Sequence, residues 1–276
     1  MDVELRSVMS LASLKAATAL PDAWHIPRLW HHIWLDDPSV PAAWVDNQAA
    51  WQQTLVTQGW TYKLWHEATA QAFLERGWPW LMPLYRRLPL AIQRSHLLRY
   101  VVLYEEGGVY ADLNLEAVPE VVPDLLAWLS VTRGAVLLAD GATHFLALTP
   151  RHPWLRHVLL ALSDQPDTWW GAVASRFSRH YQVNTSVGAW FLQQCQQTYQ
   201  PPETVPPLVV LPQAWIGPSG SHTSLTRMAL GPHWQEWDST AAQYLNQGWD
   251  QREWLWLGLL VLLLGILLWQ WLRAHL

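Results

Sequence analysis

The stretch Ala91–Val118, AIQRSHLLRYVVLYEEGGVYADLNLEAV, decides how this chain folds. Its first half is apolar on almost every side, which predicts a helix that is largely buried. Two ionisable residues, His96 and Arg99, nonetheless lie in it, and a spacing of three places them on one helix face. Gly107-Gly108 ends the helix, because a glycine takes the left-handed conformation at little cost.

A β-rich run, Val109–Leu115, follows the two glycines. If it is one strand, Asp112, Asn114 and Glu116 project from the same face. A buried helix that carries charge then turns sharply into a strand that presents oxygen ligands. That arrangement is typical of a binding site.

The oxygen atoms of Asp112, Asn114 and Glu116 suit a hard divalent cation. Mg²⁺ or Mn²⁺ prefers oxygen ligands and commonly takes one or two carboxylates together with diphosphate oxygens. The alternative is a half-exposed strand with a polar outer face. Spacing alone does not separate these two interpretations.

The composition indicates a folded domain and argues against nucleic-acid binding. Of the 276 residues, 51% are hydrophobic and 14% charged, so the chain can bury a core. The formal net charge of −5 argues against binding to a nucleic acid, which usually needs a basic face. The single cysteine, Cys195, excludes an intrachain disulfide and a Cys-based zinc site. The 22 tryptophans fill core positions or stack on sugar rings and bases, and composition does not sort them.

Alternating strand and helix patterns predict an α/β domain with a mostly parallel sheet over residues 23–240. The predicted strands are Arg28–Leu35, Tyr62–Trp65, Ala135–Ala139, Phe145–Leu148 and Leu208–Leu211. The predicted helices are Pro41–Gln58, Glu67–Arg76, Pro153–Leu162 and Gly188–Tyr199, the last capped by Thr185-Ser186.

The two ends of the chain differ from this domain. Residues 1–22 predict a surface helix or frayed tail, without the apolar core of a secretory signal. Residues 241–253 are a juxtamembrane segment before Trp254–Leu272, whose 19 residues include Gln270 as the one conventionally polar side chain. A helix of that length covers about 28 Å, close to the thickness of a bilayer core. We expect a single C-terminal transmembrane helix, and a fully buried core helix is the alternative.

The run Leu97–Asn114, LLRYVVLYEEGGVYADLN, resembles the signature of glycosyltransferase family 32, whose usual form is close to aDllRyliLyeyGGiYlDlD. Members of that family include fungal mannosyltransferases and inositol-phosphoceramide mannosyltransferases. IPRLWHHIW at Ile26–Trp34, HPWLRHVL at His152–Leu159 and PHWQEW at Pro232–Trp237 are similar to further family segments. The resemblance covers roughly residues 25–240.

The resemblance implies a GT-A type, Rossmann-like nucleotide-sugar-binding domain that transfers a hexose with retention at the anomeric carbon. It implies that Trp34 stacks on the nucleobase and that Arg99 contacts the donor sugar or phosphate. Asp112 would bind the ribose and the metal, and Tyr110 belongs to the same donor site. Arg99 and Asp112 are therefore the predicted catalytic residues.

The remaining implied residues concern the metal, Mn²⁺ or Mg²⁺. Asn114 stands where the family's second Asp ligates the ion. His233, as a metal ligand, and Trp237 would close over the diphosphate.

Two residues depart from the family pattern. His96 replaces an Asp that binds hydroxyls of the donor sugar, and it is either a hydrogen-bonding donor-site residue or a satisfied core histidine. Asn114 supplies an amide oxygen without charge, so Glu116 compensates, the metal is dispensable, or turnover has been lost. Arg99 also has an alternative, structural partner in Glu105 or Glu106.

These observations favour a membrane-anchored glycosyltransferase that acts on a lipid-linked or glycan acceptor, with its catalytic domain on the cytoplasmic face. The second hypothesis is a catalytically impaired protein that keeps the fold and binds nucleotide sugars or serves as a scaffold. A third, a pure membrane-interaction module, predicts no nucleotide binding.

Overall fold

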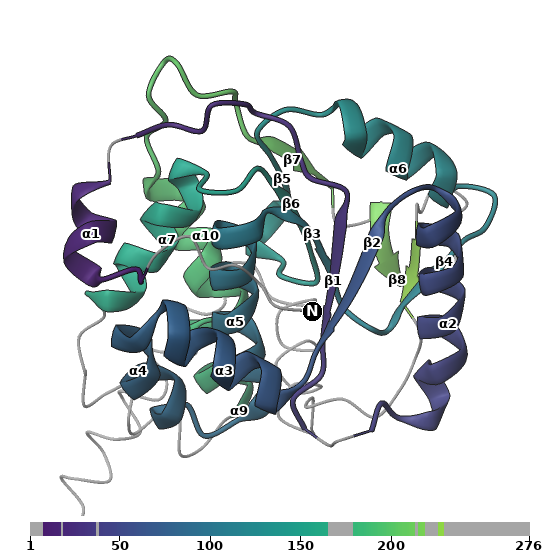
Figure 1. Cartoon of the computed structure of the whole chain (residues 1–276), viewed down its shortest axis with the longest axis horizontal. Helices are drawn as coiled ribbons and strands as arrows, with labels where there is room; N and C mark the ends of the chain where they lie inside the picture. Colours follow the sequence, from purple (N-terminus) through teal and green to yellow (C-terminus); the bar gives the residue numbers. More distant parts are fainter. Residues whose placement is uncertain are drawn as a thin grey trace, which may run out of the picture.

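A six-stranded sheet forms the centre of the computed structural model, which describes residues 8–17, 19–36, 39–164, 179–212, 215–218 and 226–228 (Figure 1). Its strands are β1 (Leu29–Ile33), β2 (Thr61–Trp65), β3 (Gly108–Ala111), β5 (Ala135–Leu138), β6 (Phe145–Leu148) and β7 (Val209–Leu211). Their order is β2-β1-β3-β6-β5-β7, and within this sheet β6 runs opposite to its neighbours. The predicted α/β domain with a mostly parallel sheet is confirmed.

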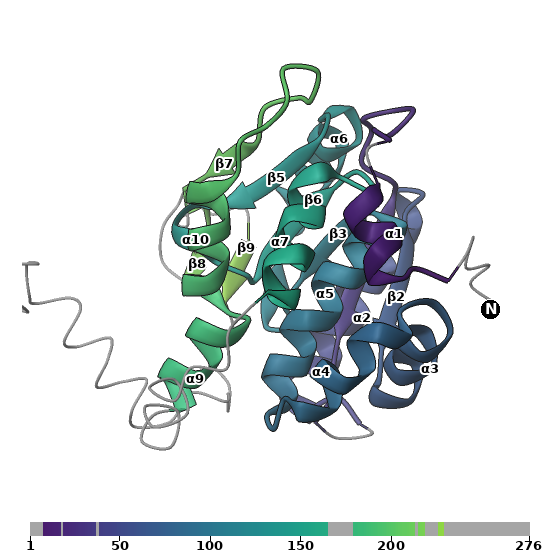
Figure 2. The same cartoon turned by 90° about the vertical axis from the view of Figure 1, so that its left-hand side faces the viewer.

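Helices cover both faces of the sheet (Figures 1 and 2). On one face lie α2 (Ala42–Thr57) and α6 (Val122–Val131). On the other lie α3 (Glu67–Gly77), α4 (Met82–Arg87), α5 (Ala91–Glu106), α7 (Pro153–Ser163) and α10 (Ala189–Thr198). Successive strand residues alternate between the two cores, as Val109 and Tyr110 of β3 do, because side chains of a strand point to opposite faces.

The smaller elements complete the chain. They are α1 (Leu11–Ala16), η1 (Pro79–Leu81), η2 (Ala139–Gly141) and α9 (Arg179–Ser186), with a second sheet of β4 (Leu115–Ala117), β9 (Thr226–Met228) and β8 (Ile216–Pro218). The predicted cap of α10 at Thr185-Ser186 is wrong. Both residues end α9, where their hydroxyls donate to carbonyls four residues earlier, and Gly188 precedes α10 instead.

Helix α5 is the buried helix that the sequence predicts. All its residues from Ser95 to Tyr104 are buried, and it packs on β3 and β6. The Tyr100 hydroxyl donates to the carbonyl oxygen of Val187, 2.7 Å away, which satisfies its polar end inside the core. Because the strand that follows α5 runs parallel to β1, the N-terminal half of α5 lies toward the carboxyl ends of β1 and β3.

Two glycines allow the chain to pass directly from α5 into β3. Gly107 has a φ of +68° and Gly108 one of +93°, conformations that residues with a side chain rarely adopt. A Cβ atom on Gly108 would lie 2.5 Å from the carbonyl oxygen of Leu29, and one on Gly107 would lie 2.5 Å from Cδ of Pro150. Both glycines are therefore required by the close contact of β3 with its neighbours, as well as by the turn.

The predicted single strand over Val109–Leu115 is wrong. Strand β3 ends at Ala111, and the Leu115 amide donates to the carbonyl oxygen of Asp112, 3.0 Å away, which closes a turn. After the turn, β4 leaves the main sheet and pairs with β9. Asp112, Asn114 and Glu116 consequently do not share one strand face. Asn favours such turns, which competes with its place in a strand.

The direction in which the strands are added reverses beside this turn. From β1 the chain crosses through α2 to β2 on one side, and it later returns through α3–α5 to β3 on the other side of β1. In open α/β sheets, ligands bind outside the carboxyl ends of the strands at such a reversal. Trp34 follows β1 there, and Asp112 follows β3.

Some predictions concern other parts of the chain. The transmembrane helix at residues 254–272, the juxtamembrane segment at 241–253, and residues 1–7 and 18 of the N-terminal segment lie outside the described residues. Within the ranges that the structure describes, no helix is long and apolar enough to cross a bilayer. Between residues 8 and 17 the predicted N-terminal helix is present as α1, and its Leu14 is fully buried.

Strand β1 carries two fully buried histidines that are held neutral. His31 accepts from the Trp65 indole at Nδ1 and therefore donates from Nε2 to the Gly107 carbonyl oxygen, 3.0 Å away. His32 accepts from the Trp30 indole at Nε2 and donates from Nδ1 to the Tyr62 hydroxyl. Burial lowers the pKa of each from 6.5 to about 3, with smaller electrostatic contributions from neighbouring groups.

Because these two histidines are neutral when buried, we predict that the folded protein is less stable in mild acid. Between pH 6.5 and pH 3 the two histidines bind protons in the unfolded chain but not in the folded chain. The free energy of unfolding therefore decreases as pH decreases. We expect a loss of at least about 2 kcal/mol between pH 7.5 and pH 5.5, measured by urea denaturation. His32→Gln should lose less over the same interval, and an unchanged free energy of unfolding would contradict the burial argument.

The glycine pair yields a second prediction. Gly108→Ala should lower the free energy of unfolding by more than about 2 kcal/mol, because the new Cβ collides with backbone as well as straining φ. Gly59→Ala is the matched control, since Gly59 has a φ of +71° but the nearest atom to its new Cβ would be a flexible Arg28 nitrogen 3.8 Å away. The control should cost about 1 kcal/mol. Equal losses in urea denaturation would show that φ alone matters at Gly108.

Candidate active site at the carboxyl edge of the sheet

The candidate site is formed where β3 ends and β6 begins. Because β6 runs opposite to β3, the residues before it, Thr143 and His144, lie beside Asp112, whose amide donates to the His144 carbonyl oxygen at 2.9 Å. The N-terminal half of α5 brings His96 and Arg99 to the same place. Sequence-distant residues are thus brought together by the sheet topology.

Arg99 is the central cation of this site. Its side chain is 1% exposed, and Nη1 lies 3.4 Å from Oδ1 of Asp112 and donates to the Thr143 carbonyl oxygen at 2.6 Å. Its guanidinium carbon lies 4.1 Å from the centre of the Tyr110 ring. A buried charge requires such partners, because removing one leaves it uncompensated.

The structural partners that the sequence offered for Arg99 lie elsewhere. Glu106 pairs with Lys63 at 2.6 Å, and Glu105 lies 3.5 Å from Arg151. Glu106 also approaches His31 to 3.9 Å, but burial keeps that imidazole neutral, so the contact is no ion pair. The interpretation of Arg99 as a partner of Glu105 or Glu106 is wrong, and Asp112 takes that place.

Tyr110 supports Asp112 from within β3. Its hydroxyl donates to Oδ1 of Asp112 at 2.5 Å. Burial raises the pKa of Tyr110 well above 10, with Asp112 adding to the rise, so the hydroxyl remains protonated and keeps donating. Both Arg99 and Tyr110 therefore contact the same carboxylate oxygen, and neither contact uses the second oxygen, Oδ2. The Asp112 side chain is 27% exposed.

His96 reaches the same segment as Arg99. Its Nε2 lies 3.3 Å from the Thr143 hydroxyl, while Nδ1 is buried and has no hydrogen-bond partner among the described residues. Burial, and secondarily the charge of Arg99, lowers its pKa well below 6.5, so His96 is neutral. An unpaired buried nitrogen beside Arg99 is a group to which a bound molecule can hydrogen-bond. His96 is thus a core histidine that is only half satisfied.

Asn114 and Glu116 follow Asp112 beyond the turn. Asn114 is 7% exposed in the turn itself, and Glu116 lies in β4 opposite Arg227 of β9. Within the described ranges, no three Asp, Glu, His or Cys side chains come together as a metal site. Of the predicted metal ligands, Asp112 and Asn114 are among the described residues.

Trp34 lies at the end of β1, on the same edge of the sheet. Its indole N–H donates to the Ser39 carbonyl oxygen at 2.9 Å, and its ring meets Trp44 edge-on at 5.4 Å between centres. It is half-buried, unlike the fully buried Trp30 and Trp51, which stack within the core. His233 and Trp237, the other predicted site residues, lie outside the described residues.

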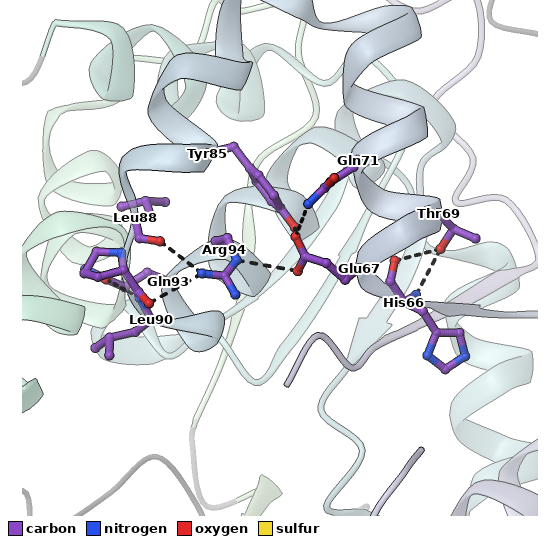
Figure 3. Close-up of polar contacts among 10 residues, drawn as sticks. His66, Glu67, Thr69, Gln71, Tyr85, Leu88, Leu90, Gln93 and Arg94 are labelled. Atoms are coloured by element: carbon purple, nitrogen blue, oxygen red, sulfur yellow. Dashed lines mark hydrogen bonds and ion pairs between the residues drawn. The ribbon is translucent and has the colours of Figure 1, made fainter. Parts of the chain in front are cut away.

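A polar cluster with residues from α3, α4 and α5 lies at the start of α5 (Figure 3). Glu67, in the first turn of α3, accepts from Gln71 at 2.7 Å and from the Tyr85 hydroxyl at 3.1 Å. Arg94 of α5 lies 3.5 Å from Glu67, without hydrogen-bond geometry, and donates to the Leu88 carbonyl oxygen. Both side chains of this pair are half-buried, so the cluster links the first turn of α5 to α3 and α4.

Thr143 is a site residue that the sequence did not indicate. It stands alone before a short strand, and its role depends on the antiparallel course of β6, which no local pattern reveals. Cys195 has no role in the site. It is buried in α10, where burial raises the pKa of its thiol to about 12.

Comparisons with known proteins agree with the resemblance of the sequence. The family described as "Glycosyltransferase sugar-binding region containing DXD motif" matches residues 41–127, which include Asp112 and Asn114. Inositol phosphoceramide mannosyltransferase 1 of Schizosaccharomyces pombe is 27% identical over 87% of this chain and 72% of its own length. Inositol phosphoceramide mannosyltransferase 2 of the same yeast is 26% identical, and the match covers 52% of this chain and 41% of that protein.

Among solved structures, the PaToxG glycosyltransferase has a TM-score of 0.43 and 14% identity, covering 64% of this chain and 71% of that one. The similarity rests on the sequence matches and not on this distant structural one. Over residues 41–127 the chain is therefore similar to the glycosyltransferase sugar-binding region that contains a DXD motif, and over most of its length it is similar to an inositol phosphoceramide mannosyltransferase.

Proposed function

We propose that this protein is a retaining hexosyltransferase that takes its sugar from a nucleoside diphosphate sugar. The observation that carries the proposal is the buried Arg99, held between Asp112 and the Thr143 carbonyl at the carboxyl edge of the sheet. A GT-A type domain binds its donor at this kind of edge, and the similarity to the DXD-containing sugar-binding region supports the same chemistry. The donor diphosphate lies against Arg99, and the nucleobase lies against Trp34.

Arg99 contributes to the reaction through its charge. As the bond between sugar and diphosphate breaks, negative charge accumulates on the leaving group, and a fixed cation stabilises that charge where it develops. Arg99 needs no rearrangement for this, since helix α5, Tyr110 and Thr143 already hold it. Burial makes the interaction stronger than it would be in water.

A divalent cation, Mn²⁺ or Mg²⁺, fits the residues beside Arg99. Both ions prefer hard oxygen ligands and often take one or two carboxylates plus substrate phosphate oxygens. Oδ2 of Asp112 is outside the contacts with Arg99 and Tyr110, and the amide of Asn114 lies two residues away. These residues, with His233, would hold the ion. When bound, it would neutralise part of the charge on the diphosphate.

The acceptor is proposed from the relatives and from the sequence. The relatives' names specify transfer of mannose to inositol phosphoceramide. We propose a lipid acceptor with a polyol headgroup, met at a membrane to which residues 254–272 anchor the chain, with the domain on the cytoplasmic side. His96 is proposed to hydrogen-bond a hydroxyl of the donor sugar through its unpaired Nδ1.

The second candidate function is a nucleotide-sugar-binding protein without turnover. Two observations favour it: His96 is neutral, and Asn114 carries an uncharged amide. Asp112 is therefore the one carboxylate among these three residues. Weak metal binding would leave the leaving group insufficiently stabilised. The two candidates share the donor site and differ in whether the sugar is transferred.

The first test is hydrolysis and transfer with a panel of GDP- and UDP-sugars in Mn²⁺. Asp112→Asn should lower kcat/KM at least about 100-fold, since it removes the partner of Arg99 and a metal ligand together. Asp124→Asn, at an exposed carboxylate in α6, is the control and should keep wild-type activity. If Asp112→Asn retains full activity, the site assignment fails.

A second test separates the enzyme from the impaired binder. Asn114→Asp adds a charged oxygen ligand, so the Mn²⁺ concentration for half-maximal activity should fall about tenfold. Titration of activity against Mn²⁺ measures it. An inactive wild-type protein that gains activity with Asn114→Asp would establish the impaired binder instead.

A further inference from the structure

Asn47 of helix α2 makes an unusually complete set of contacts with the segment that follows Asp112. Its Nδ2 donates to the carbonyl oxygens of Leu113 and Leu115, each at 2.7 Å. Its Oδ1 accepts from the Ala117 amide at 3.3 Å. One helical turn later, the Trp51 indole donates to the same Leu115 oxygen at 2.6 Å.

These contacts follow the geometry of a strand edge. In an extended strand the backbone groups of alternate residues point to the same side, so Leu115 and Ala117 of β4 present one edge, and the Leu113 carbonyl oxygen of the preceding turn reaches the same carboxamide. The other edge of β4 pairs with β9, with Glu116 opposite Arg227. Because β4 is the outer strand of the order β4-β9-β8, the Asn47 carboxamide occupies the edge where another strand would hydrogen-bond.

The consequence concerns Asn114. It lies between the two residues whose carbonyls Asn47 holds, in a turn closed by the Leu115 amide and the Asp112 carbonyl oxygen at 3.0 Å. Arg99 and Tyr110 fix Asp112 from the side of α5 and β3, whereas Asn47 fixes the turn from the side of α2. The orientation of the Asn114 amide relative to Asp112 depends on this second attachment.

We propose that Asn47 is a positioning residue that sets the Asp112–Asn114 turn for a divalent cation and the diphosphate of the donor. This inference rests on the proposed donor site. A carboxamide is suited to the task because it offers two N–H donors and one acceptor together. An Asp at this position would place its oxygens against two carbonyl oxygens. Trp51 is fully buried and anchors α2 in the core, so it does not serve as the test residue.

The experiment measures binding of Mn²⁺ in the presence of GDP or UDP, from the electron paramagnetic resonance signal of free Mn²⁺. Asn47→Ala and Asn47→Asp should both weaken Mn²⁺ binding 10- to 100-fold, which is the usual effect of removing a residue that orients ligands. Gln52→Ala, an exposed polar residue on the same helix, is the matched control and should bind as the wild type does. Circular dichroism melting checks that each variant remains folded.

A kinetic measurement accompanies binding. Activity of Asn47→Ala should return toward that of the wild type as Mn²⁺ is raised, which a general loss of structure would not produce. The inference is overturned if Asn47→Ala binds Mn²⁺ as tightly as the wild type does. It is also overturned if Asn47→Ala and Gln52→Ala weaken Mn²⁺ binding to the same extent. A wild-type protein that binds Mn²⁺ with neither GDP nor UDP overturns the proposed donor site, and the inference with it.

Discussion

A guanidinium in the middle of a buried helix must be compensated, and this requirement joins the principal parts of the molecule. Arg99 takes an ion-pair partner from the end of β3, a carbonyl oxygen from the segment before β6 and an aromatic face from β3. Moving any of these elements would leave a charge without water or partner. The candidate site at this edge of the sheet is thus also a place where a buried charge constrains the fold.

Much of the framework is predictable from sequence because apolar periodicity and glycine positions are local properties. The length and burial of α5, its end before Gly107-Gly108, and most of the sheet follow from them. The turn after Asp112 does not. Alternating polar residues fit a strand equally well, and the break arises because β4 leaves to pair with β9, a partner more than a hundred residues later.

The candidate site likewise contains some residues that the sequence indicates and others that only the folded structure reveals. The motif around Arg99, Tyr110 and Asp112 is contiguous enough to be recognised, and its members do meet in space. Thr143 and Asn47 enter through long-range topology. A lone threonine and a helical asparagine carry no distinguishing pattern, although one contacts His96 and Arg99 and the other holds the turn through three hydrogen bonds.

The neutrality of His96 has a consequence for how an anionic ligand meets this edge. Among His96, Arg99, Asp112 and Asn114, one positive and one negative side chain remain, so their formal charges cancel. With carboxylates at all three of the other positions, as in the pattern of the family, one arginine would face three anions. A cation would then have to precede or accompany a diphosphate to relieve the repulsion. A diphosphate donor, as proposed for this site, would approach side chains whose formal charges already cancel, so these charges would not dictate whether the ion or the nucleotide arrives first.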